Sequence, residues 1–171
     1  GSIDPWTATA AIVFIALGAG AAGAINMWYD RDIDLQMSRT MNRPLPAGRM
    51  QPGPALAFGI IMALAAVSSM AYYVNLVSAA LLLVTILYYV FVYTVWLKRL
   101  TPQNVVIGGV SGALPPVVGW ASVTGGIDAG ALSLFLIILL WTPPHSWALA
   151  LYRRGDYEAA GVPMLPVAAG V

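Results

Sequence analysis

Long apolar segments separated by short polar ones dominate this chain. Five runs approach the roughly 20 residues that a helix needs to cross a bilayer, and they cover Trp6–Trp28, Pro54–Tyr73, Leu76–Leu97, Val105–Val123 and Ala129–Leu151. Inside lipid, every backbone N–H and C=O needs an internal partner, which only helices and closed barrels provide. The runs lack the alternation of barrel strands, so the pattern predicts an all-α polytopic membrane protein with five transmembrane helices.

Composition supports the membrane interpretation and excludes several kinds of site. Of the 171 residues, 60% are hydrophobic and only 9% are charged. The chain has no cysteine, which excludes disulfides, thiolate metal sites and cysteine nucleophiles. The basic residues are few and form no stripe, so we expect no nucleic-acid partner.

The positive charges are sorted completely to one side of the predicted spans. The eight basic residues, which all follow the first, third or fifth run, are Arg31, Arg39, Arg43, Arg49, Lys98, Arg99, Arg153 and Arg154. The opposite side carries only Asp4 and Asp128. Since loops rich in Lys and Arg stay inside, these loops are predicted to face the cytoplasm, or the matrix in a mitochondrion.

Oxygen ligands recur at the inner end of the first run. Asn26, Asp30 and Asp34 are four residues apart, a spacing that keeps them along one face of a helix. Carboxylates with retained waters and phosphate oxygens suit Mg²⁺, and the lack of nearby histidine or cysteine argues against zinc and copper. The alternative is a solvated helix end in which the aspartates pair with Arg31 or Arg39.

Cations near these carboxylates are candidates for binding phosphate, because a fixed guanidinium group holds phosphate through two hydrogen bonds. The alternative for each is anchoring at the membrane surface. The candidates are Arg39, Arg43, Arg49, Lys98, Arg99 and Arg153. A second acidic cluster, Asp156 and Glu158, follows the fifth run, while Asp32 is expected to be a surface charge or the partner of a nearby arginine.

Prolines and the single histidine mark the last two runs. Pro115-Pro116 and Pro143-Pro144 are predicted to kink or break their helices. His145 follows the second pair, and it is either a hydrogen-bonded helix residue or a ligand contact, for example to a heme iron. Small residues, including Gly18, Gly108 and Gly112, are typical of close helix packing.

Several motifs resemble the UbiA-type intramembrane prenyltransferases. The segment from Asn26 to Asp34, with the Arg-Thr-x-x-Arg-Pro-Leu-Pro-x-Gly-Arg that ends at Arg49, resembles their first aspartate-rich motif. The segments from Tyr93 to Trp120 and from Trp141 to Pro166 are similar to the heme branch of that superfamily. Residues 1–171 are therefore identified as a partial UbiA-type domain.

The resemblance implies a fold and an activity. The family fold is a ring of nine helices around a lipid-facing cavity, of which this chain would hold the second to the sixth, without the first and the last three. The implied reaction transfers a farnesyl group from farnesyl diphosphate to a vinyl group of heme B, giving heme O and diphosphate. Heme B is a substrate here, and Mg²⁺ is the implied cofactor.

The resemblance also implies residue roles. The implied catalytic residues are Asp30, Asp34, Lys98 and Arg99. The implied metal ligands are Asn26, Asp30, Asp34 and Asp156, although the second cluster departs from the superfamily's usual Asp-x-x-x-Asp. The implied diphosphate-binding residues are the six cations named above, and His145 would contact heme.

The setting and two alternative functions complete the expectations. We expect an integral protein of a bacterial inner membrane with its site on the cytoplasmic side, or of the mitochondrial inner membrane. Beyond membrane lipid, implied partners are heme A synthase or cytochrome oxidase assembly factors. The alternatives are a UbiA-type enzyme with an aromatic or quinone precursor as acceptor, and a membrane transporter or channel. Charges confined to one face of the membrane argue against a pathway through it.

Overall fold

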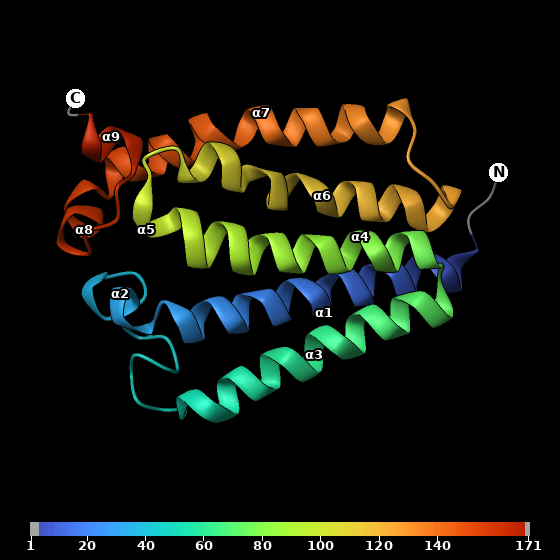
Figure 1. The fold of residues 1–171 in the computed structure, drawn as a ribbon, viewed down its shortest axis with the longest axis horizontal. Coiled ribbons are helices and arrows are strands. Elements are labelled where there is room, and N and C mark those ends of the chain that lie inside the picture. Colours follow the sequence, from blue (N-terminus) through green and yellow to red (C-terminus); the bar gives the residue numbers. More distant parts are fainter. Residues whose placement is uncertain (1–3, 170–171) are drawn as a thin grey trace.

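Five long helices lie side by side in the computed structural model, which describes residues 4–169 (Figure 1). In chain order the elements are α1 (Pro5–Tyr29), α2 (Arg31–Gln36), α3 (Pro52–Tyr73), α4 (Leu76–Leu87), the π-helix η1 (Tyr88–Leu97), α5 (Lys98–Leu100), α6 (Asn104–Thr124), α7 (Ala129–Tyr152), α8 (Arg154–Ala159) and α9 (Leu165–Ala168). The described residues contain no strand. The all-α prediction is therefore confirmed.

The predicted spans agree with the helices to within a few residues. Five helices are long and apolar enough to cross a membrane, and the third of them runs without interruption through α4, η1 and α5 as Leu76–Leu100. Together with the apolar composition, they make this an integral membrane protein. The structure also leaves much apolar surface exposed, as a chain solvated by lipid should.

The two ends of the bundle differ in chemistry. The short helices α2, α5, α8 and α9, with the basic loops, all lie at one end (Figure 1). At the other end, side chains cap the helices: Asp4 accepts a hydrogen bond from Thr7 N in α1, and Asp128 accepts from Gly130 N in α7. Capping explains the only two acids on that side, because the first N–H groups of a helix have no partner within it.

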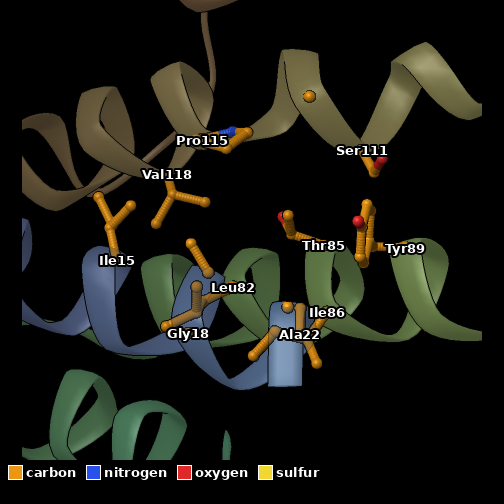
Figure 2. Close-up of a pocket in the computed structure, with 13 residues that line it drawn as sticks. Ile15, Gly18, Ala22, Leu82, Thr85, Ile86, Tyr89, Ser111, Pro115 and Val118 are labelled. Atoms are coloured by element: carbon orange, nitrogen blue, oxygen red, sulfur yellow. The ribbon is translucent and has the colours of Figure 1, made fainter. Parts of the chain in front are cut away.

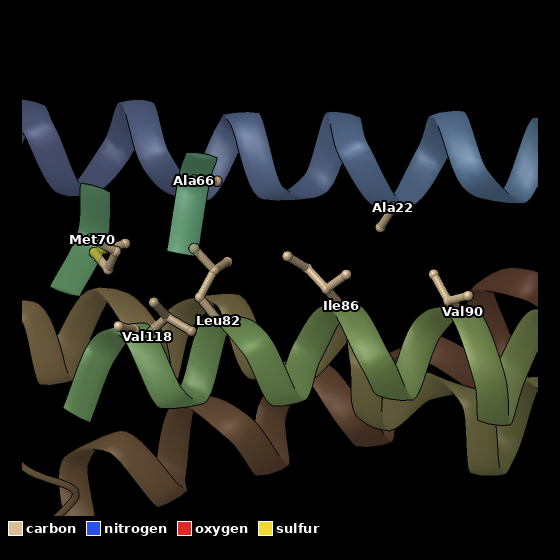
Figure 3. Close-up of a cluster of buried hydrophobic side chains, with 8 residues drawn as sticks. Ala22, Ala66, Met70, Leu82, Ile86, Val90 and Val118 are labelled. Carbon is tan, nitrogen blue, oxygen red and sulfur yellow. The ribbon is translucent and has the colours of Figure 1, made fainter. Parts of the chain in front are cut away.

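Some of the small residues allow the close packing that the sequence predicted. A Cβ on Gly18 would lie 2.8 Å from Leu82, and one on Gly108 would lie 2.2 Å from the Tyr93 ring. Gly23 and Gly112 have open space instead. The core between the helices is formed by Ala22, Ala66, Met70, Ala79, Leu82, Ile86, Val90 and Val118 (Figure 3). These contacts hold α1, α3 and α4 as one unit against α6.

The proline pairs do not end their helices. Both α6 and α7 continue through Pro115-Pro116 and Pro143-Pro144, so the prediction of a break is wrong. Each proline removes only its own N–H from the helix ladder, and packing of α6 against its neighbours maintains the rest. The carbonyls deprived of a donor in α6 are those of Ser111 and Gly112, which border a pocket described below.

A π-helix forms part of the third span, just before its basic end. The ten residues of η1 have the wider i→i−5 pattern, and Lys98 N continues it by donating to Tyr93 O. Such turns are rare and often occur at functional sites. Nothing in the apolar sequence of η1 predicts it.

Candidate functional site

Two parallel helices form the centre of the site, and each contributes two polar residues that are four positions apart in the sequence. Asn26 of α1 contacts Thr94 of η1, and Asp30 at the end of α1 contacts Lys98 at the start of α5. Both pairs are 68 residues apart in the chain, because α1 and the α4–η1 helix run in the same direction with a constant register. The first acidic motif and the Lys98-Arg99 pair thus meet at the membrane boundary.

Asp30 is a fully buried carboxylate surrounded by donors. Its Oδ2 accepts from Asn26 Nδ2 at 2.7 Å and from the Lys98 ammonium group, and its Oδ1 lies 3.4 Å from Arg99 Nη2. The side chain is 0% exposed, whereas that of Lys98 is 17% exposed. A buried carboxylate stays ionised only when paired and hydrogen-bonded in this way. The site therefore presents a fixed negative charge beside two cations.

Asp34 belongs to a separate short helix. The expectation of one continuous helical face is wrong, because Asp30 leaves helical geometry with φ −89° and ψ 11°, and α2 begins after it. The i→i−4 backbone hydrogen bonds nevertheless persist, from Asp30 N to Asn26 O and from Asp34 N to Asp30 O. Asp34 is buried and accepts from Arg43 Nη1 at 2.9 Å. The buried Thr40 donates to the Asp34 carbonyl and thereby folds the following loop back onto α2.

The ion pairs of the aspartates differ from those expected if the end of the first helix were simply solvated. That alternative expected Arg31 or Arg39 as partners of the aspartates, but Asp30 pairs with Lys98 and Arg99 instead. Arg31 donates to the Trp28 carbonyl and lies over the Trp28 ring.

Asp32 is the expected partner of an arginine. It accepts two hydrogen bonds from Arg99, at 2.7 and 2.8 Å, in a bidentate pair. These bonds lower the pKa of Asp32 to about 2, against the opposing effect of partial burial. Its side chain is 58% exposed, so we regard it as a surface ion pair that orients Arg99.

The second acidic cluster touches the loop after α2. Asp156 of α8 accepts from Ser38 Oγ at 2.7 Å, while Glu158 pairs with Arg154 on the solvent side. An apolar cluster beneath holds these segments together, and it consists of Ile33, Met37, Val105, Ala150, Val162 and Met164. Asp156 as a metal ligand stays a prediction, because the side-chain contact recorded for its carboxylate among residues 4–169 is with Ser38 of the loop.

The other candidate residues are exposed and make no ion pair with Asp30 or Asp34 among the described residues. Arg39, Arg49 and Arg153 are exposed, with Arg49 donating to the Asn42 carbonyl and Arg153 lying over the Tyr152 ring. His145 is also exposed and stacks on Trp141, with ring centroids 4.2 Å apart. It makes no hydrogen bond among the described residues. Their roles toward diphosphate and heme stay predictions.

Two adjoining pockets lie between the helices, and the charged residues of the site line neither of them. One pocket of about 260 Å³ lies between α1, α4 and α6, and a second of about 200 Å³ lies between η1, α6 and α7. Figure 2 shows the first, with Tyr89 and Ser111 near one end and Ile15 and Val118 near the other. The pockets share the lining residues Tyr89, Ser111 and Gly112, and we call the pair the trough. A larger groove of about 610 Å³ between α1, α3 and α4 is likewise lined by none of the charged residues.

Thr94 is the site residue that sequence reasoning missed. It is fully buried, accepts from Asn26 Nδ2 at 3.1 Å and donates to the Tyr89 carbonyl at 2.9 Å. It thus links Asn26 to Tyr89, which lines both pockets of the trough. The only feature of the sequence that could have indicated it is its position four residues before Lys98, the same separation as between Asn26 and Asp30.

The oxygens left without a partner are of the kind that a hard cation prefers. Asn26 and Asp34 are buried, but Asn26 Oδ1 and Asp34 Oδ1 accept no hydrogen bond from the described residues. No group of three His, Cys, Asp or Glu side chains gathers within residues 4–169. An ion held here would take its remaining ligands from water or from another molecule.

Comparisons with known proteins identify the family of the chain. A model described as the UbiA prenyltransferase family matches residues 1–171. Curated relatives include "Protoheme IX farnesyltransferase" of Parvibaculum lavamentivorans, 60% identical over 99% of this chain and 54% of the relative. "Protoheme IX farnesyltransferase 2" of Mesorhizobium japonicum is 58% identical over 99% of this chain and 54% of the relative. "Protoheme IX farnesyltransferase" of Rhizobium rhizogenes is 59% identical over 100% of this chain and 54% of the relative. No solved structure matches.

The chain spans about half the length of the curated relatives that it matches. The match nevertheless runs from one end of this sequence to the other and includes both aspartate-bearing segments. Because the family model spans all 171 residues, this chain belongs to the UbiA prenyltransferase family.

Proposed function

We propose that the complete protein transfers a farnesyl group from farnesyl diphosphate to a vinyl group of heme B, giving heme O and diphosphate. The observation that carries the proposal is the buried Asp30, held between Lys98, Arg99 and Asn26 at the membrane boundary. A carboxylate and cations fixed together beside an apolar trough suit an allylic diphosphate, which has an anionic head and an apolar tail. The names of the relatives support heme as the acceptor.

Asn26, Asp30 and Asp34 would hold Mg²⁺, with Asp156 contributing from the second cluster. The ion would neutralise charge on the diphosphate as the allylic C–O bond breaks. Lys98 and Arg99 would stabilise the same leaving group from the other side, and Arg43, next to Asp34, would assist them. We further assign diphosphate binding to Arg39, Arg49 and Arg153, whose side chains are exposed at the same end of the bundle.

The trough would hold the isoprenoid and protect the reacting carbon. Its lining between α1, α4 and α6 is almost entirely apolar, and the part between η1, α6 and α7 adds the hydroxyl groups of Ser111, Thr142 and Ser146 beside Tyr89 and Tyr93. Aromatic faces stabilise positive charge and apolar walls exclude water. The heme vinyl group would form the new C–C bond at the allylic carbon, and water would then add to the resulting cation and release a proton. The product carries a hydroxyethylfarnesyl group.

The proposed orientation in the membrane is based on the positions of the basic residues. Because all basic loops lie at one end, we propose that this end faces the cytoplasm of a bacterial inner membrane, or the matrix of a mitochondrion. We also propose that the chain corresponds to helices two to six of a nine-helix ring. Heme A synthase or cytochrome oxidase assembly factors remain the proposed partners.

His145 is proposed to contact heme. It is exposed on α7, stacked on Trp141, and positioned so that a flat ligand could extend the stack. His145→Ala in the complete protein is expected to raise KM for heme by about tenfold, the loss of roughly 1.4 kcal/mol of binding, with KM for farnesyl diphosphate within a factor of two. Steady-state kinetics with each substrate varied in turn checks this. Equal changes in both values would contradict a heme contact.

Mass spectrometry of extracted hemes tests the proposed function. Membranes that contain the complete protein should convert heme B to a farnesylated, hydrated heme when farnesyl diphosphate and Mg²⁺ are supplied. Chelation of Mg²⁺ should abolish the product, and readdition should restore it. Membranes without the protein are the control. An unmodified heme pool beside a prenylated quinone precursor would move the acceptor to the aromatic class, and no prenylated product at all would overturn the enzyme assignment.

A further inference from the structure

The amide of Asn26 has both of its N–H groups engaged. Asn26 Nδ2 donates to Asp30 Oδ2 at 2.7 Å and to Thr94 Oγ1 at 3.1 Å. An asparagine side chain has two donor hydrogens and one carbonyl oxygen. Both hydrogens therefore point into the bundle, and the Oδ1 atom is left as the outward acceptor.

The Thr94 hydroxyl reinforces this orientation, which the Asp30 carboxylate also favours. A hydroxyl has a single hydrogen, and that of Thr94 is used by the Tyr89 carbonyl at 2.9 Å. Thr94 therefore offers only lone pairs to Asn26. If the amide were reversed, its oxygen would face two acceptors, the Thr94 hydroxyl oxygen and the Asp30 carboxylate, in a buried place where an unmade hydrogen bond is costly.

The π-helix makes this hydroxyl geometry possible. In an α-helix, a threonine hydroxyl bonds to the carbonyl three or four residues earlier. Here the acceptor, Tyr89, is five residues earlier, as the i→i−5 pattern of η1 requires. The backbone N–H of Lys98 follows the same pattern and donates to the Tyr93 carbonyl. In this position the Lys98 side chain contacts Asp30.

We propose that Thr94 is a positioning residue that turns the carbonyl oxygen of Asn26 toward the cation site. This rests on the proposed function, because it presupposes a divalent ion between the asparagine, the aspartates and the diphosphate. Thr94 is not itself a proposed ligand of the ion. It acts through Asn26: together with the Asp30 carboxylate, its hydroxyl oxygen favours the amide orientation that presents a ligand oxygen over the one that presents an N–H group, which would repel a cation.

The test compares Thr94→Val, which keeps the shape and removes the hydroxyl, with Thr94→Ser, which keeps the hydroxyl. The complete protein in lipid nanodiscs is titrated with Mn²⁺, and binding is followed by the loss of the free-ion electron paramagnetic resonance signal. Thr94→Val should weaken Mn²⁺ binding by about 10- to 100-fold, the usual cost of losing a residue that orients a metal ligand. The Mg²⁺ concentration for half-maximal turnover should rise equally, with kcat at saturating Mg²⁺ within a few-fold. Thr94→Ser should restore both.

Ser78→Ala is the matched control. Ser78 is also fully buried and bonds across helices to the Val118 carbonyl, but it lies on the opposite half of the same span. Its loss should leave the Mn²⁺ titration unchanged. In an Asn26→Ala background, Thr94→Val should cause no further change, because there is no amide left to orient.

The outcomes separate this inference from the proposed function. A wild-type protein that neither binds Mn²⁺ nor depends on Mg²⁺ would overturn the proposed function itself. A wild-type protein that does both, with Thr94→Val titrating identically, would overturn only the role of Thr94. If Thr94→Val and Thr94→Cys both fail to fold while Thr94→Ser folds, the hydroxyl serves the stability of the bundle, and the inference is likewise overturned.

Discussion

Asp30→Asn in the complete protein is expected to reduce farnesyl transfer at least about a thousandfold, while the protein still folds into the membrane. The change removes one negative charge from a fully buried position and keeps the shape of the side chain. An ion at such a site supplies several kcal/mol of charge stabilisation, and each 1.4 kcal/mol is worth about tenfold in rate. Single-turnover measurement of farnesylated heme with saturating substrates checks the prediction.

Asp32→Asn is the matched comparison. It makes the same chemical change two residues further along, at a carboxylate whose side chain is 58% exposed and which pairs only with Arg99. Because exposed ion pairs contribute about 0–1 kcal/mol, transfer should fall by less than about tenfold. Equal losses in the two variants, or near-normal turnover by Asp30→Asn, would remove the special role of Asp30.

Lys98→Met is expected to cost about 3–5 kcal/mol of folding stability, because it leaves the carboxylate of Asp30 buried without its closest cation. The remaining cation, Arg99, lies 3.4 Å from the other oxygen and is already engaged by Asp32. Thermal or detergent-induced unfolding of the purified protein measures the change. Lys98→Met should also lower transfer, since the leaving diphosphate loses a positive partner.

A double-variant cycle separates charge from packing. Asp30→Asn combined with Lys98→Met has no unpaired charge at this position, so it should recover most of the stability lost by Lys98→Met alone. It should recover none of the activity. If the double variant is as unstable as Lys98→Met, the lysine contributes through its hydrocarbon chain, and the ion pair is not what stabilises this end of the bundle.

Most of the fold could be predicted from the sequence because its causes are local. A bilayer needs apolar helices of a given length, so runs such as Leu76–Leu97 identify their own spans. The distribution of basic residues along the chain is enough to place Arg43 and Lys98 at the same end of the helices. The chemistry of the site also followed from residue types, since Asn26, Asp30 and Asp34 offer only oxygen atoms to a cation.

The pairings at the site could not be predicted, because they depend on how helices far apart in the chain are aligned. The sequence suggested Arg31 or Arg39 as partners for the aspartates, simply because these residues are near in the chain. The structure brings Lys98 to Asp30 across 68 residues. A shift of one helical turn between α1 and the α4–η1 helix would exchange every partner without changing any apolar run.

The spans and the gathering of basic residues at one end are thus properties of the chain itself, since hydrophobic length and charge act within short segments. The predicted orientation and ligand chemistry rest on the same local features. Tertiary packing alone decided which cation neutralises which carboxylate, that η1 adopts a π-helix, and that Thr94 meets Asn26. These outcomes require two helices to agree in register and rotation, which no segment specifies by itself.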